Sequence, residues 1–187
     1  MAYVANTHPL DTCDQFPPMR FTTLDHGDVE LPKFFGQKWG VVLFYRGHWC
    51  GYCRRQLVDF QQHLTEIEAR HGAVIAISVD SAAHARKMVD FGHLTYPVAF
   101  GADALEVASR VGCFYEAGDR FLQKTAFVLR PGGEIARASY STGPTGALTS
   151  GDTLYSLEFF QKNPHHRTGI LRPAEPVMAT PEPPAKG

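Results

Sequence analysis

Two cysteines, Cys50 and Cys53, are separated by two residues in the segment WCGYC. At this spacing the second thiol can attack a mixed disulfide formed at the first, so the pair can cycle between dithiol and disulfide without a cofactor. A zinc site would need four ligands, and no second Cys or His pair occurs at ligand spacing. We therefore expect a redox-active dithiol, with no metal ion and no organic cofactor.

The residues around the dithiol favour a reactive thiolate. Cys50 lies between a strand pattern and a helix pattern, so it should sit on or just before the first helical turn. Unpaired N–H groups and the positive end of the helix dipole stabilise a thiolate there, and Arg54 and Arg55 add positive charge. At least one of the two thiols should therefore have a lowered pKa.

The position of each cysteine assigns it a role. Solvent should reach Cys50 at the turn into the helix, whereas Cys53 lies one turn inside and should be more shielded. We expect Cys50 to attack and mild oxidation to join it to Cys53. Cys113 follows a helix end and is expected to be a buried small hydrophobe, while Cys13 precedes the core and is expected to be incidental.

Four residues near the cysteines in the sequence could support their chemistry. Trp49 is expected to line the site, and Tyr52 lies between the two cysteines. Arg46 could orient an anionic substrate or pair with a carboxylate, and the sequence leaves both alternatives open. His48 is the histidine closest to the dithiol in the sequence and could be either a base or a surface residue.

The hydrophobic periodicity alternates between strand and helix and predicts an α/β fold. Strands are expected at 40–45, 73–79, within 94–101, at 125–129 and at 134–140. A helix should carry the stripe Leu57, Phe60, Leu64 and Ile67 and end at His71, with further helices at 81–92, 103–112 and 154–160. The result is a mixed central sheet of about five strands with helices on both faces.

Composition defines the domain and excludes several partners. The chain has 187 residues, a net charge of −1 and no block of Lys and Arg, so we expect neither nucleic acid nor a membrane surface as a partner. No apolar run approaches the ~20 residues of a membrane span, and no signal peptide is visible, so the cytoplasm is the expected location. We expect an N-terminal arm at 1–15, one domain at 16–163 and a Pro-rich, disordered tail at 164–187.

The segment WCGYCR resembles the active site of the thioredoxin superfamily, typically Trp-Cys-Gly-Pro-Cys-Lys, with Tyr52 in place of Pro. Four longer stretches resemble the peroxiredoxin-like branch of that superfamily, the group of alkyl hydroperoxide reductase and thiol-specific antioxidant proteins. These stretches are PPMRFTTLDHGDVEL, FYRGHWCGYCRRQL, YPVAFGADALEVASRVG and KTAFVLRPGGEI. The resemblance covers about residues 16–160 and implies a thioredoxin-like fold.

The resemblance also implies roles for individual positions. In the peroxiredoxin motif Pro-x-x-x-Thr-x-x-Cys, the threonine falls on Cys50 and the peroxide-reactive cysteine on Cys53, whereas thioredoxins attack with the first cysteine. The arginine that helps peroxiredoxins polarise peroxide falls on Lys124, as does the cis-proline of thioredoxins. Lys124 and the adjacent Thr125 are therefore further candidates for the site.

Three functions fit these residues. The first is a thiol-disulfide oxidoreductase, acting on a protein or low-molecular-weight disulfide with an external thiol reductant. The second is a thiol peroxidase that reduces hydroperoxides with Cys53 or Cys50. The third is a non-enzymatic, redox-sensitive binding module with the same fold. A homodimer is compatible with all three.

Overall fold

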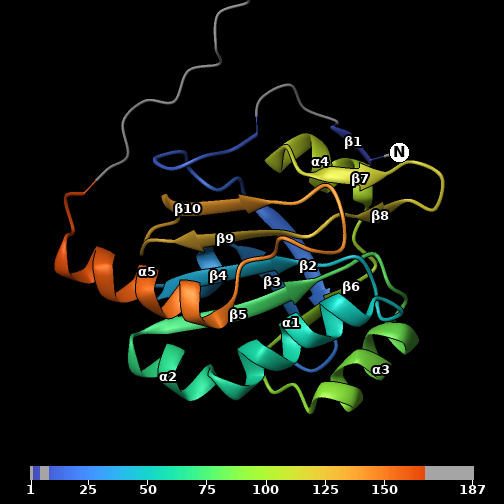
Figure 1. The fold of residues 1–187 in the computed structure, drawn as a ribbon, viewed down its shortest axis with the longest axis horizontal. Helices are drawn as coiled ribbons and strands as arrows, with labels where there is room; N and C mark the ends of the chain where they lie inside the picture. Colours follow the sequence, from blue (N-terminus) through green and yellow to red (C-terminus); the bar gives the residue numbers. More distant parts are fainter. Residues whose placement is uncertain (1, 5–8, 167–187) are drawn as a thin grey trace, which may run out of the picture.

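The computed structural model describes residues 2–4 and 9–166. Its main sheet has seven strands in the order β10-β9-β4-β5-β6-β2-β3 (Figure 1). Their bounds are β2 Met19–Thr23, β3 Asp28–Leu31, β4 Trp39–Phe44, β5 Gly72–Ile77, β6 Val98–Phe100, β9 Thr125–Leu129 and β10 Ile135–Tyr140. Strands β4, β5 and β6 are parallel and the other pairings are antiparallel, which confirms the predicted mixed sheet.

The central strand β4 is buried along its whole length. Val41 and Leu43 belong to the hydrophobic core on one face of the sheet, and Val42 and Phe44 belong to the core on the other. A strand covered on both faces has no polar side to alternate with, which is why this segment is a continuous apolar run. The end of β4 is thereby held rigidly, and the dithiol follows directly after it.

Helices cover both faces of the sheet, as predicted. Residues of α1, α2, α3 and α5 join the first core and residues of α4 join the second. The helices are α1 Gly51–Gln62, α2 Leu64–Ala69, α3 Ala82–Gly92, α4 Ala104–Val111 and α5 Ser150–Lys162, with a short 3-10 helix η1 at Lys33–Phe35. Ser81 caps α3 and Asp103 caps α4, each accepting a hydrogen bond from a backbone N–H of the first turn.

Two predictions about the elements are wrong. The sheet has seven strands rather than about five, because β2 and β3 form a hairpin that adds an edge beside β6. Strand β2 alternates buried and exposed residues, the pattern of a strand with one buried face. The predicted helix ending at His71 is instead two helices, which break at His63, where the backbone departs from helical geometry.

A second, three-stranded sheet has the order β1-β7-β8, with bounds β1 Ala2–Val4, β7 Phe114–Glu116 and β8 Phe121–Leu122. Part of the predicted N-terminal arm contacts the domain, because Cys13 N–H donates to Ile135 O and Ile135 N–H donates to Asp14 O. The predicted boundary between the N-terminal arm and the domain, at residue 16, stays a prediction. Most of the predicted tail, from residue 167 onward, lies outside the described residues. Among the described helices, none combines the length and apolarity needed to cross a membrane.

Candidate active site

The dithiol lies at the start of α1, where the sequence places it. Cys50 is the N-cap residue, with extended backbone angles, and its sulfur accepts a hydrogen bond from Cys53 N–H at 3.3 Å. The loop between β4 and Cys50 turns at Gly47, which has φ +154°. A Cβ there would lie 2.6 Å from Nε1 of Trp49, so only glycine allows the indole to lie against the turn.

The two sulfurs are in direct contact in the reduced protein. The thiol of Cys53 donates a hydrogen bond to Sγ of Cys50 at 2.8 Å, so the Cys50 sulfur accepts two hydrogen bonds from one residue. Cys50 is 4% exposed and Cys53 is fully buried. Cys53 is the more shielded thiol, as predicted, but little of Cys50 reaches the surface, and the expectation of an open Cys50 is wrong.

The environment of Cys53 keeps its proton in place. Burial, followed by the hydrogen bond to Cys50, raises the pKa of the Cys53 thiol to about 12, against the opposing effect of a backbone hydrogen bond from Arg46. A thiol that must donate to its neighbour stabilises negative charge on that neighbour, not on itself. Cys53 therefore does not have the lowered pKa expected for a thiol of the pair, and it acts as the hydrogen-bond donor to Cys50.

Lys124 directly precedes β9, and Thr125 is the first residue of that strand. Lys124 is buried, and burial lowers the pKa of its ammonium, while attraction to Cys53 and Cys50 acts in the opposite direction. Its Nζ donates to Pro144 O at 3.3 Å. Thr125 is buried and its hydroxyl donates to Gln123 O, so it supports the strand rather than the sulfurs. The structure thus brings Lys124, distant in sequence, to the cysteines.

Arg46, Trp49 and Tyr52 lie close to the dithiol in the sequence, and the structure shows the surroundings of each side chain. The guanidinium of Arg46 lies 4.8 Å from the ring centre of Trp49 and 4.9 Å from that of Phe121. Arg46 therefore packs between two aromatic rings, an arrangement that neither sequence alternative anticipated. Trp49 is 49% exposed and Tyr52 is 52% exposed, so both aromatic side chains are available to a molecule that approaches the dithiol.

His48 has a partner that sequence analysis missed. Its backbone N–H donates to Oδ2 of Asp80 at 2.8 Å, and its Nδ1 lies 3.2 Å from Oδ1 of the same carboxylate. Asp80 is buried and also accepts a hydrogen bond from the hydroxyl of Ser78. A signal was present in the sequence, because Asp80 follows the strand β5, which runs parallel to β4, and parallel strands bring their following loops together.

Comparison with known proteins assigns the family. The family model described as AhpC/TSA family matches residues 12–138, well over half of the sequence. The chain belongs to the AhpC/TSA family. The family resemblance found in the sequence motifs is thereby confirmed.

Two relatives of this AhpC/TSA chain carry the name peroxiredoxin. "Peroxiredoxin" of Methanothermobacter thermautotrophicus is 27% identical over 133 residues, which cover 68% of this chain and 62% of the relative. "Peroxiredoxin 2" of Sulfurisphaera tokodaii is 29% identical over 68 residues, 36% of this chain and 32% of the relative. The chain thus aligns with less than two thirds of the length of either relative.

Solved structures show the same fold. AhpC of Enterococcus faecalis superposes with a TM-score of 0.73 at 17% identity, covering 88% of this chain and all 100% of that one. Peroxidoxin BcpB of Mycobacterium tuberculosis superposes with a TM-score of 0.71 at 15% identity, covering 81% of this chain and 98% of that one. The predicted thioredoxin-like fold is confirmed.

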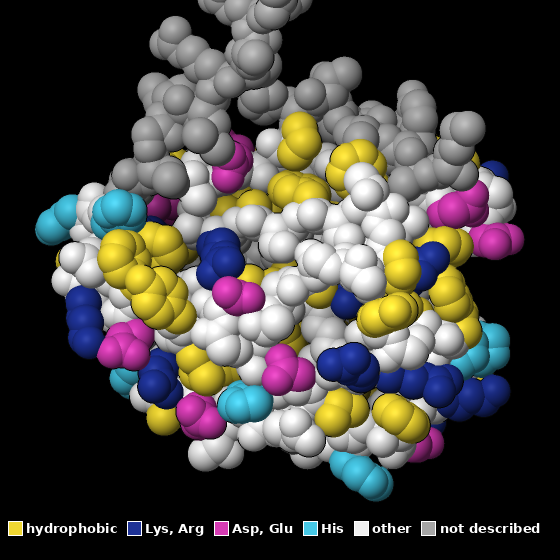
Figure 2. Space-filling view, viewed as in Figure 1, with side chains coloured by type: hydrophobic (Ala, Val, Ile, Leu, Met, Phe, Trp, Pro, Cys, Tyr) yellow, Lys and Arg dark blue, Asp and Glu magenta, His cyan; other side chains and the backbone are white. Residues whose placement is uncertain are grey.

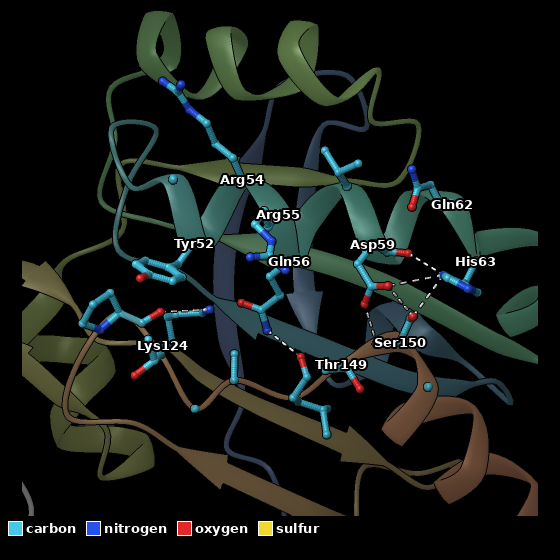
Figure 3. Close-up of a pocket in the computed structure, with 18 of the residues that line it drawn as sticks. Tyr52, Arg54, Arg55, Gln56, Asp59, Gln62, His63, Lys124, Thr149 and Ser150 are labelled. Atoms are coloured by element: carbon cyan, nitrogen blue, oxygen red, sulfur yellow. Dashed lines mark hydrogen bonds and ion pairs between the residues drawn. The ribbon is translucent and has the colours of Figure 1, made fainter.

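A groove of 1020 Å³ runs along the outer side of α1 in this family member (Figure 3). Tyr52 and Lys124 lie at one end of it, and Arg54 and Arg55 also line it. Figure 2 shows Lys and Arg side chains gathered over α1 and α3 on this face of the molecule. The groove is therefore positively charged where it approaches the dithiol.

The other end of the groove contains Asp59, His63 and Ser150. The Ser150 hydroxyl donates to Oδ1 of Asp59 at 2.8 Å and lies 3.0 Å from Nδ1 of His63, and Ser150 N–H donates to Oδ2 of Asp59. These are the residue types of a hydrolase triad, but the same nitrogen of His63, Nδ1, faces both Ser150 and Asp59, whereas a triad histidine uses one ring nitrogen for each partner. The cluster ties the start of α5 to α1.

Proposed function

We propose that this protein is a thiol-disulfide oxidoreductase in which Cys50 attacks and Cys53 resolves. The observation that carries the proposal is the direct contact of the two sulfurs, in which Cys50 accepts hydrogen bonds from both the thiol and the N–H of Cys53. Such a pair provides a nucleophile and, next to it, a second thiol able to release the product.

The reaction has two steps with balanced electrons. The Cys50 thiolate attacks one sulfur of a substrate disulfide, a new S–S bond forms, and the other substrate sulfur leaves as a thiolate that takes up a proton. Cys53 then loses its proton and attacks the Cys50 sulfur, which forms the Cys50–Cys53 disulfide and releases the second substrate thiol. The substrate gains two electrons, and an external thiol reductant restores the dithiol.

Lys124 supports the first step electrostatically. Its ammonium is buried near both sulfurs, where positive charge stabilises a thiolate more strongly than it would in water. We propose that a disulfide-bearing segment of a protein substrate contacts exposed Tyr52 and Trp49 and extends into the groove along α1. Arg54 and Arg55 would favour an acidic segment there.

A second candidate, a thiol peroxidase, is favoured by membership of the AhpC/TSA family and by the names of the two relatives. In this reaction a cysteine thiolate attacks one peroxide oxygen, an S–O bond forms as the O–O bond breaks, and the leaving oxygen takes up a proton. The resulting sulfenic acid condenses with the other thiol to a disulfide and water. The raised pKa of Cys53 supports Cys50 over Cys53 as the attacking thiol here too.

The test is stopped-flow kinetics of the reduced protein with a protein disulfide, with a small disulfide and with hydrogen peroxide. Fast reaction with the protein disulfide supports the main proposal, and faster reaction with peroxide would favour the second candidate. If all three oxidants form the Cys50–Cys53 disulfide only slowly, without catalytic turnover, the redox-sensitive binding module becomes the better interpretation. Cys13→Ser is the matched control, because Cys13 is exposed and outside the site.

Location and assembly stay proposals. We propose the cytoplasm, because a dithiol that starts its cycle reduced fits a reducing compartment. We also propose that the oxidoreductase forms a homodimer, and light scattering at several concentrations tests this, since a monomeric mass throughout would contradict it.

A further inference from the structure

A cluster of three metal-ligating side chains lies beside the dithiol. His48, Asp80 and His84 offer one ligand atom each, and these atoms all lie within 4.8 Å of one another. The three residues come from two different segments, since His48 precedes α1 and the other two lie at or near the start of α3. None of them forms part of the thiol chemistry described above.

We propose that His48, Asp80 and His84 bind a divalent late transition-metal ion, with Zn²⁺ as the reference ion. Two imidazoles and one carboxylate form a donor set that such ions accept in proteins, with one coordination position left for water or a small anion. This inference concerns a site separate from Cys50 and Cys53 and does not depend on the proposed thiol reaction.

The spacing of the first two ligand atoms fits an ion. Nδ1 of His48 and Oδ1 of Asp80 are 3.2 Å apart. Two ligands about 2.0 to 2.1 Å from a tetrahedral ion are about 3.3 Å from each other, so an ion can be inserted between these atoms with little movement. The same distance also fits a hydrogen bond, and the experiment below distinguishes the two.

The carboxylate is already oriented for coordination. Oδ2 of Asp80 accepts hydrogen bonds from His48 N–H at 2.8 Å and from the Ser78 hydroxyl at 3.2 Å, which leaves Oδ1 facing the imidazole. Metal-binding carboxylates are commonly fixed by such hydrogen bonds to the oxygen that does not face the ion. Asp80 is buried, so its negative charge is poorly screened by water.

The third ligand is free to complete the site. The ring of His84 stacks on that of His48 with ring centres 3.9 Å apart, and His84 is exposed. Within the described part of the chain, no side-chain hydrogen bond fixes the His84 ring, so rotation about its side-chain bonds can turn a nitrogen toward Oδ1 of Asp80.

Space and charge around the cluster permit a fourth ligand. A cavity of 340 Å³ is lined by the three residues together with Trp49, Phe121 and the charged side chains of Arg46 and Asp119. The Arg46 guanidinium opposes a cation, but it is held between two aromatic rings, and Asp119 adds a compensating negative charge. The cavity leaves room for a water molecule or small anion on the ion.

The experiment is isothermal titration calorimetry with ZnCl₂ on the full chain in which Cys13, Cys50 and Cys53 are replaced by serine, so that accessible thiolates cannot bind the metal. We expect one Zn²⁺ per chain and a loss of at least about tenfold in affinity on adding His84→Ala. The matched control is His26→Ala, which removes another exposed histidine and should leave the affinity unchanged.

A second measurement locates the ion without relying on variants. Zinc should shift the ¹H–¹⁵N NMR signals of the segments around His48 and around Asp80 and His84, and leave those around His63 unchanged. Failure to bind zinc would overturn the proposal, as would binding that His84→Ala does not weaken. Shifts confined to another histidine-containing segment would also overturn it.

Discussion

The dithiol and Cys113 are both buried thiol sites, but they lie at opposite kinds of helix end. Cys50 is the N-cap of α1, and its sulfur accepts a hydrogen bond from the Cys53 N–H of the first turn. Cys113 follows α4 immediately after its C-cap, Gly112, where unpaired carbonyl groups and the negative end of the dipole lie. The cysteine side chains at these two positions therefore lie in electrostatic fields of opposite sign.

The two sites also differ in their partners. Burial raises the pKa of the Cys113 thiol to about 12, against the opposing effect of a backbone hydrogen bond. Burial raises the pKa of Cys53 to a similar value, but there the retained proton is donated to Cys50. The buried Cys53 thiol takes part in the proposed chemistry because it donates its proton to a neighbouring sulfur. Cys113 has the properties of a core residue.

The largest expected effect comes from replacing each of the two thiols of the pair in turn. Cys50→Ser should abolish disulfide exchange, because no nucleophile remains at the helix start. Cys53→Ser should still attack but accumulate a mixed disulfide, because the resolving thiol is missing. Mass spectrometry of each variant after incubation with a protein disulfide detects the trapped species.

Alkylation provides the check on this assignment. The variant that retains Cys50 should react with iodoacetamide at neutral pH much faster than the variant that retains Cys53, and Cys13→Ser should match the unmodified chain. If the variant retaining only Cys53 reacts faster with both iodoacetamide and peroxide, then Cys53 is the attacking thiol and the peroxidase candidate becomes the better one.

The next largest effect concerns Lys124, the buried positive charge near the dithiol; no cation is among the described groups that shift the pKa of Cys113. Lys124→Met should slow alkylation of Cys50 at neutral pH about tenfold, because the buried ammonium no longer stabilises the thiolate. Lys124→Arg keeps a positive charge and should recover part of the rate. Lys87→Met, on the outer side of α3, is the control and should change nothing. Equal rates for Lys124→Met and the unmodified chain would exclude this role.

The comparison also explains what the sequence could predict. The dithiol and its helix start were predictable, because a Cys-x-x-Cys pair between a strand and a helix is a local signal of consecutive residues. The parallel strands β4 and β5 were predictable for the same reason, since each is a short apolar run. Cys113 was predicted to be buried from its place after a helix end, and it is buried.

Contacts across long sequence separations were only partly predictable. That the loops after β4 and β5 meet follows from the parallel pairing of the two strands, but the specific contact of His48 with Asp80 depends on strand register, which two continuous apolar runs do not specify. The hairpin of β2 and β3 was missed although β2 alternates buried and exposed residues. The contact of Arg46 with Phe121 likewise depends on a neighbouring sheet that has only short strands.

A smaller effect is expected from pH. The folded protein holds the Cys113 proton up to a pKa of about 12, whereas an unfolded cysteine releases it near about 8.5. Between these values the folded state binds more protons than the unfolded state, so the free energy of unfolding falls as pH rises, by about 1.4 kcal/mol per pH unit for each such thiol. This contribution is fully present below about pH 8.5.

Urea unfolding between pH 7 and pH 10 measures this dependence. Cys113→Ala should show a shallower loss of stability above pH 8.5 than the unmodified chain, because one of the raised thiols is gone. The exposed Cys13 provides the control, and Cys13→Ser should keep the full slope. The same slope in Cys113→Ala and in the unmodified chain would show that Cys113 is not held as a neutral thiol.

The smallest effect should come from Cys113 at neutral pH. Cys113→Ala removes one buried sulfur from the second core and should lower the free energy of unfolding by about 1 kcal/mol. Its rate of disulfide exchange should equal that of the unmodified chain, because Cys113 has no part in the dithiol cycle. Peptide mapping after mild oxidation should find Cys50 joined to Cys53. A dominant Cys50–Cys113 bridge, or a loss of exchange in Cys113→Ala, would make Cys113 a resolving thiol and remove the contrast between the two sites.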